Sequence, residues 1–100
     1  IPPEVSLFEI ARAFGDVLKR IDAYEDHHVK REQLSTRERM SQILAMLNSE
    51  DFTPFERLFS VEEGRAGVVV TFLALMELVK ELLVELYQTE PFSTIYVKAY

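Results

Sequence analysis

Apolar residues recur along most of the chain at the spacing of amphipathic helices. Over residues 7–24 they fall every three or four positions on one stripe, and charged residues fall on the opposite side. The same spacing returns in residues 36–47, before a polar loop at residues 48–51. We therefore predict two amphipathic helices in the first half of the chain.

Two further helices are expected after this loop. A short one covers residues 54–59 and has Pro54 at its first position, where the missing N–H of proline costs nothing. A long one begins at Val61 or Arg65 and ends near Leu83, with its start left open by two nearby glycines.

Each of the four predicted helices is preceded by the same signature, a Ser or Thr followed three residues later by Glu. In such a capping box the hydroxyl accepts a hydrogen bond from one free backbone N–H, and the glutamate accepts from another. The predicted boxes are Ser6/Glu9, Ser35/Glu38, Thr53/Glu56 and Ser60/Glu63.

The end of the chain changes to a two-residue period, which is typical of strands. Alternation over residues 84–88 and 94–98, around a turn that contains proline, predicts a β-hairpin. A short strand at residues 28–31 would complete a small sheet. The predicted fold is mainly α with a small β-hairpin or sheet, in the order of a winged helix-turn-helix. Residues 1–100 are expected to be one domain, with a linker at residues 1–5.

The long helix is apolar on two sides. At 100° per residue, one side is an ordinary core stripe: Val68, Phe72, Leu75, Val79, Leu82 and Leu83. The opposite side is apolar in its first half and charged in its second: Val69, Val70, Leu73 and Ala74, then Glu77, Lys80 and Glu81. A helix of this kind is buried on more than one side. The second side is covered either by another helix of the same domain or by a partner.

The charge balance argues against nucleic acid as that partner. In a winged-helix protein that reads DNA, the corresponding helix enters the major groove and presents basic and amide side chains. Residues 61–90 instead hold two basic and six acidic residues, and the chain has a formal charge of −6. We predict a protein partner. The residues that come nearest to a basic cluster are Lys30, Arg31, Arg37 and Arg39. A weak DNA contact at these residues stays open, and the alternative is that they form a solvated face.

The hairpin adds aromatic candidates. Alternate residues face the core, which leaves Tyr87 and Tyr96 on the outer face and Phe92 at the tip of the wing. Exposed aromatic residues are enriched among those that dominate binding at interfaces, although the two tyrosines could simply pair across the strands. The candidate partner-binding residues are Val69, Val70, Leu73, Glu77, Lys80, Phe92 and Tyr96.

Catalytic, cofactor and metal chemistry is not indicated. The chain has no cysteine, and its three glycines form no phosphate-binding pattern. Adjacent histidines, His27 and His28, point in different directions from a strand, so a solvated loop or a pH-sensitive contact is favoured over a zinc site. We predict a non-enzymatic protein without a cofactor; a small hydrolase is the remotest alternative. The longest apolar stretch is about half of the roughly 20 residues that a bilayer span requires, so no membrane partner is expected.

Several segments together resemble one known family. The run Val69-Val70-Thr71-Phe72-Leu73-Ala74-Leu75-Met76-Glu77-Leu78 is followed by Gln88, Pro91-Phe92-Ser93 and Ile95-Tyr96-Val97. Residues 5–8, 29–35, 39–40 and 55–59 agree with the same pattern. Together they resemble the C-terminal part of segregation and condensation protein A, the bacterial and archaeal kleisin family. The sequence begins with Ile and not with Met, so we expect it to be a piece of a longer chain.

The resemblance implies a winged-helix domain that docks on the ATPase head of a Structural Maintenance of Chromosomes (SMC) protein. It implies that the rest of the kleisin binds segregation and condensation protein B, and that the complex supports chromosome condensation and partition during cell division. The implied location is the cytoplasm, at the nucleoid. It assigns the head contact to Val69, Val70, Leu73, Phe92 and Tyr96. The alternative is a fragment of a winged-helix transcriptional regulator that binds DNA.

Overall fold

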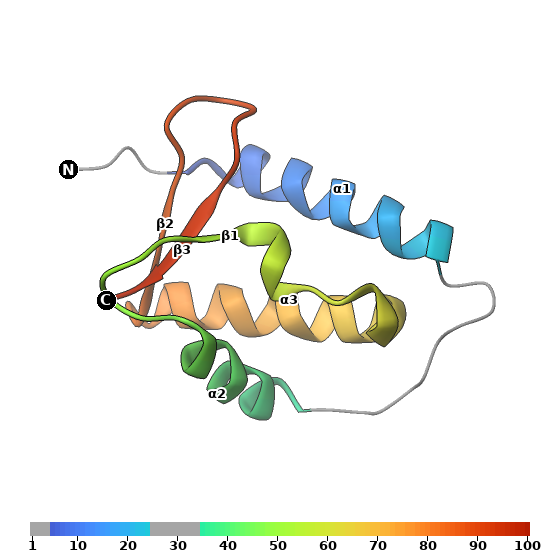
Figure 1. Cartoon of the computed structure of the whole chain (residues 1–100), viewed down its shortest axis with the longest axis horizontal. Helices are drawn as coiled ribbons and strands as arrows, with labels where there is room; N and C mark the ends of the chain where they lie inside the picture. Colours follow the sequence, from blue (N-terminus) through green and yellow to red (C-terminus); the bar gives the residue numbers. More distant parts are fainter. Residues whose placement is uncertain (1–4, 25–34) are drawn as a thin grey trace.

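A computed structural model describes residues 5–24 and 35–100 of the chain (Figure 1). It contains three helices: α1 (Leu7–Tyr24), α2 (Thr36–Met46) and α3 (Gly64–Lys80). Three short strands form one antiparallel sheet: β1 (Thr53–Pro54), β2 (Val84–Tyr87) and β3 (Tyr96–Ala99). The prediction of a mainly α, winged helix-turn-helix fold with a small sheet is confirmed.

The third strand of the sheet comes from a different place than expected. β3 lies between β2 and β1, and β1 pairs Thr53 with Val97 and Pro54 with Tyr96. The strand that we predicted at residues 28–31 lies outside the described residues. β1 escaped prediction because it is two residues long and contains a proline, which cannot donate to a ladder.

Two 3-10 turns, η1 (Phe55–Leu58) and η2 (Val61–Glu63), connect β1 to α3. The predicted short helix therefore exists, but Pro54 is its N-cap residue and not its first residue. α3 starts at Gly64, between the two predicted positions. Gly64 has a φ of 72°, which glycine adopts without a steric penalty.

One of the four predicted capping boxes is complete. Ser35 Oγ accepts from the Glu38 N–H at 3.1 Å, and Glu38 Oε1 accepts from the Ser35 N–H at 3.2 Å. The Ser6 hydroxyl accepts from the Glu9 N–H at 3.1 Å, but the Glu9 carboxylate bonds elsewhere. Neither η1 nor α3 has a side-chain cap hydrogen bond, so the two remaining boxes do not cap these helices.

α3 ends at Lys80, three residues before the predicted end. Leu82 adopts a φ of 63°, its N–H donates to Val79 O at 3.1 Å, and the Leu83 N–H donates to Leu78 O at 3.0 Å. This is a Schellman ending with leucine where glycine is usual. Leu82 and Leu83 are 70% and 43% exposed, so their prediction as core residues is wrong.

α3 is the central helix, with α1 and α2 on two sides of it and the sheet near its C-terminal end (Figure 1). Phe72 of α3 stacks on Phe14 of α1, with 4.1 Å between ring centroids. The fully buried side chains come from all of these elements: Ile21, Ile43, Phe55, Val68, Leu75, Leu78, Val84, Ile95 and Val97. Alternation predicts four inward residues in the hairpin, and three of them are in this set, whereas the fourth, Leu86, is half-buried. One side of α3 is thus fixed in the core, and only the other side can meet a partner.

Candidate partner-binding surface

The side of α3 that faces away from the core carries the predicted apolar residues. Val69 is 38% exposed and Leu73 is 52% exposed, whereas Val70 is half-buried and Ala74, predicted on the same side, is fully buried. At 100° per residue, Val69, Leu73 and Lys80 lie within about 40° of one another. We call these three residues the outer stripe. Within residues 5–24 and 35–100, no other helix buries Val69 or Leu73, and their role in partner binding stays a prediction.

The outer stripe ends in a charged residue, Lys80, and two acidic residues lie beside it toward the C-terminal end of α3. Lys80 is exposed and lies in the last turn, where a positive charge complements the helix dipole. Glu77 is half-buried, and Glu81 is exposed just after the helix. The apolar residues therefore stand beside a mixed but mostly acidic border, which would suit a partner with basic residues around an apolar patch.

Phe92 projects from the wing loop, which we define as residues 88–95 between β2 and β3. It is 68% exposed and has a φ of 68°. Left-handed backbone costs a non-glycine residue about 1–2 kcal/mol, and a ring this exposed recovers little of that cost by burial. The stability of the domain alone does not explain a phenylalanine at this position.

Tyr96 belongs to an aromatic cluster on the outer face of the sheet. It is half-buried and lies opposite Tyr87 in the β2–β3 register. The Phe52 ring centroid is 5.3 Å from that of Tyr87 and 6.4 Å from that of Tyr96, and Lys98 Nζ lies 4.7 Å from the Phe52 centroid. These contacts support the cross-strand alternative for the two tyrosines. A contact of Tyr96 with a partner stays a prediction.

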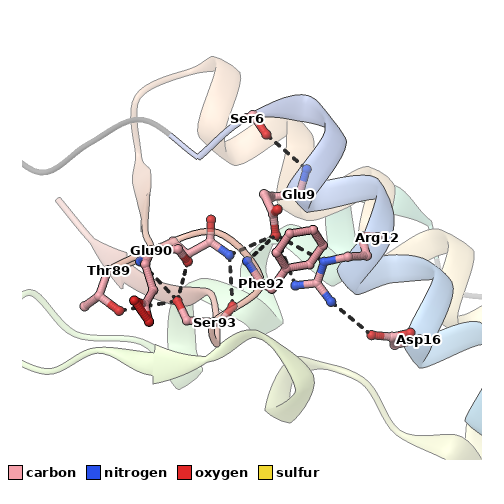
Figure 2. Close-up of polar contacts among 9 residues, drawn as sticks. Ser6, Glu9, Arg12, Asp16, Thr89, Glu90, Phe92 and Ser93 are labelled. Carbon is pink, nitrogen blue, oxygen red and sulfur yellow. Dashed lines mark hydrogen bonds and ion pairs between the residues drawn. The ribbon is translucent and has the colours of Figure 1, made fainter.

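Glu9 joins the first turn of α1 to the wing loop (Figure 2). Its Oε1 accepts hydrogen bonds from the Gln88 side chain and from the Phe92 N–H, each at 3.1 Å. Arg12 donates to the same oxygen through two nitrogens, both at 3.1 Å, and its guanidinium lies 5.1 Å from the centre of the Phe92 ring. We call Glu9, Arg12, Gln88 and the Phe92 N–H the Glu9 network.

The Glu9 carboxylate is ionised in this setting. Burial opposes its charge and would raise its pKa, because Glu9 is only 6% exposed. The hydrogen bonds from Gln88, from the Phe92 N–H and from Arg12, together with the positive charge of Arg12, outweigh burial and hold the pKa of Glu9 below its ordinary value. Sequence reasoning missed this role because the Ser6 and Glu9 spacing had a sufficient local explanation.

The proposed basic cluster is not a single exposed face. Arg39 is 8% exposed and forms an ion pair with Glu63 at 2.8 Å. Arg37 is exposed, while Lys30 and Arg31 lie outside the described residues. Within the described part of the chain, Arg37 is thus the one member of the cluster available to phosphates.

The described residues contain neither a candidate metal site nor a candidate membrane span. Residues 5–24 and 35–100 contain no group of three acidic or histidine side chains that could hold a metal ion. His27 and His28 lie outside that region. No helix in these segments is both long enough and apolar enough to traverse a bilayer.

Comparison with known proteins gives the family. The family model described as Segregation and condensation protein ScpA matches residues 3–100. The chain belongs to this family. The segregation and condensation protein A of Coxiella burnetii is 50% identical over 99 residues, which cover 99% of this chain and 37% of the relative. The protein of Xylella fastidiosa is 48% identical, and the match covers 99% of this chain and 33% of the relative. The protein of Listeria welshimeri is 36% identical, and the match covers 95% of this chain and 39% of the relative.

The resemblance found in the sequence is therefore confirmed at the level of the family. The chain spans only 33–39% of the length of these three relatives. The part that it covers folds as the winged helix described above, with α3 and the wing loop as its candidate surfaces.

Proposed function

We propose that the chain is the C-terminal winged-helix domain of a kleisin and that it docks on the ATPase head of an SMC protein. In this proposal residues 1–100 are one domain, and their first five residues are a linker. The domain is a non-enzymatic interaction module that uses no cofactor. Parts of the whole protein outside this chain bind segregation and condensation protein B. The complex supports chromosome condensation and partition at the nucleoid, in the cytoplasm.

The exposed apolar residues of the outer stripe carry this proposal. Complete burial of a leucine side chain contributes about 1.5–3 kcal/mol, and Leu73 has about half of its surface left to bury. Docking therefore gains about 1 kcal/mol from Leu73 alone. The acidic residues at the border steer the domain toward a basic surface and away from phosphates.

DNA binding is the second candidate, and the same surface argues against it. Arg39 is engaged by Glu63, and the outer stripe offers one cation, Lys80, beside Glu77 and Glu81. A gel-shift experiment at low salt separates the two functions, because phosphate contacts are strongest there. Retardation of duplex DNA that disappears as salt rises would favour the regulator.

A titration of the chain into a purified SMC head tests the docking proposal. Leu73→Glu places a carboxylate without a partner in an apolar contact, so we expect affinity to fall at least about a hundredfold. The variant should remain folded because Leu73 is 52% exposed. Circular dichroism checks the fold, and calorimetry measures the affinity.

Met46→Glu is the matched control, because Met46 is 53% exposed but lies on α2. It makes the same charge change on an equally exposed apolar residue, and we expect it to bind as the wild type does. Wild-type affinity in Leu73→Glu would contradict the proposal. Equal losses in both variants would also contradict it, because the effect would then not depend on α3.

A further inference from the structure

The tip of the wing loop is stiffened by its own hydrogen bonds. Ser93 Oγ donates to Glu90 O at 2.6 Å and accepts from the Glu90 N–H at 3.2 Å. The Thr89 and Ser93 hydroxyl oxygens are 3.3 Å apart. These contacts are all local, so they shape the turn without fixing its position relative to the helices.

The Glu9 network supplies that position. Gln88 is 6% exposed and uses one amide group twice, since Nε2 donates to Glu9 Oε1 at 3.1 Å and to Ser93 O at 2.9 Å. The Phe92 N–H is bound by the same carboxylate. Glu9 thus holds both ends of the loop tip against α1, across 79 and 83 residues of sequence. Hydrogen bonds to an ionised acceptor are about twice as strong as neutral ones.

This link acts at Phe92, one of two non-glycine residues with a positive φ in the described part of the chain. The Phe92 N–H is fixed by Glu9 in a left-handed conformation, with Arg12 against the ring. The network therefore stabilises a conformation that leaves the ring 68% exposed. If this contact served only the stability of the core, we would expect either a buried ring or a glycine at this φ.

We propose that Glu9 is a positioning residue for docking: its carboxylate holds the wing loop so that the Phe92 ring is presented before the partner arrives. This inference rests on the proposed function, in which Phe92 contacts the SMC head. Order that exists before binding does not have to be imposed at the moment of binding, so affinity is higher. Glu9 need not touch the head at all.

Glu9→Gln tests the inference, with Glu90→Gln as the control for the same charge change on an exposed residue of the loop. Nuclear magnetic resonance of the isotope-labelled chain reports hydrogen exchange of the Phe92 amide. We expect exchange at least about tenfold faster in Glu9→Gln, and affinity for the SMC head about tenfold weaker. Glu90→Gln should match the wild type in both measurements.

A double variant that includes Phe92→Ala separates positioning of the wing loop from a general loss of stability. In Phe92→Ala, the ring to be presented is gone, so adding Glu9→Gln should weaken binding no further. Gln88→Ala tests the same link without altering α1, in case Glu9→Gln lowers the helix content, and we expect the same two changes.

Three results would overturn the inference. Unchanged exchange at Phe92 would show that the carboxylate does not hold the loop. Faster exchange with unchanged affinity would show that docking does not use the order of the loop. A wild-type chain that fails to bind the head would refute the proposed function itself, and Glu9 would then only stabilise the wing.

Discussion

Replacing Gly67 with alanine tests how Glu63 packs against α3. Gly→Ala inside an exposed helix normally stabilises a protein by about 1 kcal/mol. At Gly67, however, a new Cβ would lie 2.4 Å from Glu63 Cβ and 2.9 Å from Glu63 Oε1. Carbon atoms do not approach so closely, so Glu63 has to move. We therefore expect this substitution to destabilise the domain.

The magnitude follows from what Glu63 releases when it moves. Its Oε2 accepts a hydrogen bond from Arg39 at 2.8 Å, and Arg39 is 8% exposed. Arg39 Nε already finds no hydrogen-bond partner in the described structure. A charge-assisted bond contributes about 1.5–3 kcal/mol. We take about 2 kcal/mol, since the Glu63 side chain is 35% exposed. After the helix-propensity gain, Gly67→Ala should lose about 1 kcal/mol.

Urea unfolding followed by circular dichroism measures this difference. Gly15→Ala is the control, because Gly15 lies inside α1 and a Cβ there would meet no atom within 4 Å. We expect Gly15→Ala to raise the free energy of unfolding by about 0.5–1 kcal/mol. If Gly67→Ala stabilised the domain as much as Gly15→Ala, the packing argument would be refuted.

Three further predictions use the same unfolding assay. Leu75→Ala should lower the free energy of unfolding by about 3–5 kcal/mol because Leu75 is fully buried. A decrease smaller than that caused by Leu73→Ala would place the core on the wrong side of α3. Ser35→Ala removes the completed cap of α2 and should lower the free energy of unfolding by about 1 kcal/mol. Ser41→Ala, at an exposed position of the same helix, should not lower it. Glu9 has a folded-state pKa below its ordinary value of 4.5, so its contribution to stability is present above that pH and is lost as the pH falls through the folded-state pKa. Glu9→Gln should therefore lose less stability than the wild type between about pH 5 and pH 3. An equal loss in the two proteins would contradict the reasoning.

The features that the sequence predicted well are those governed by local periodicity. α1 has the predicted bounds because a cap at Ser6 and a continuous apolar stripe define it together. Helical arithmetic also placed Val69 and Leu73 on the open side of α3. The end of α3 was misjudged because the apolar spacing continues to Leu83, and the helix stops at a leucine in a left-handed conformation without the usual glycine.

The features that the sequence did not predict depend on contacts between distant residues. The sequence predicts a local cap for Glu9, but its carboxylate accepts hydrogen bonds from Gln88 and Phe92 at the other end of the chain. The sequence groups Arg39 with a basic cluster, but Arg39 forms an ion pair with Glu63. Neither partner could be identified from spacing, because both contacts form only when helices and wing are packed together.

The two-residue β1 strand determines how the sheet can meet other chains. One edge of the sheet is Thr53–Pro54, where proline has no N–H to offer, and the other edge is only the four residues of β2. Edges this short provide a poor template for an incoming strand. We therefore expect the domain to resist strand-by-strand aggregation, even with Phe52 and Tyr87 on its outer face. Assembly through this fold must consequently rely on side chains rather than on extension of the sheet.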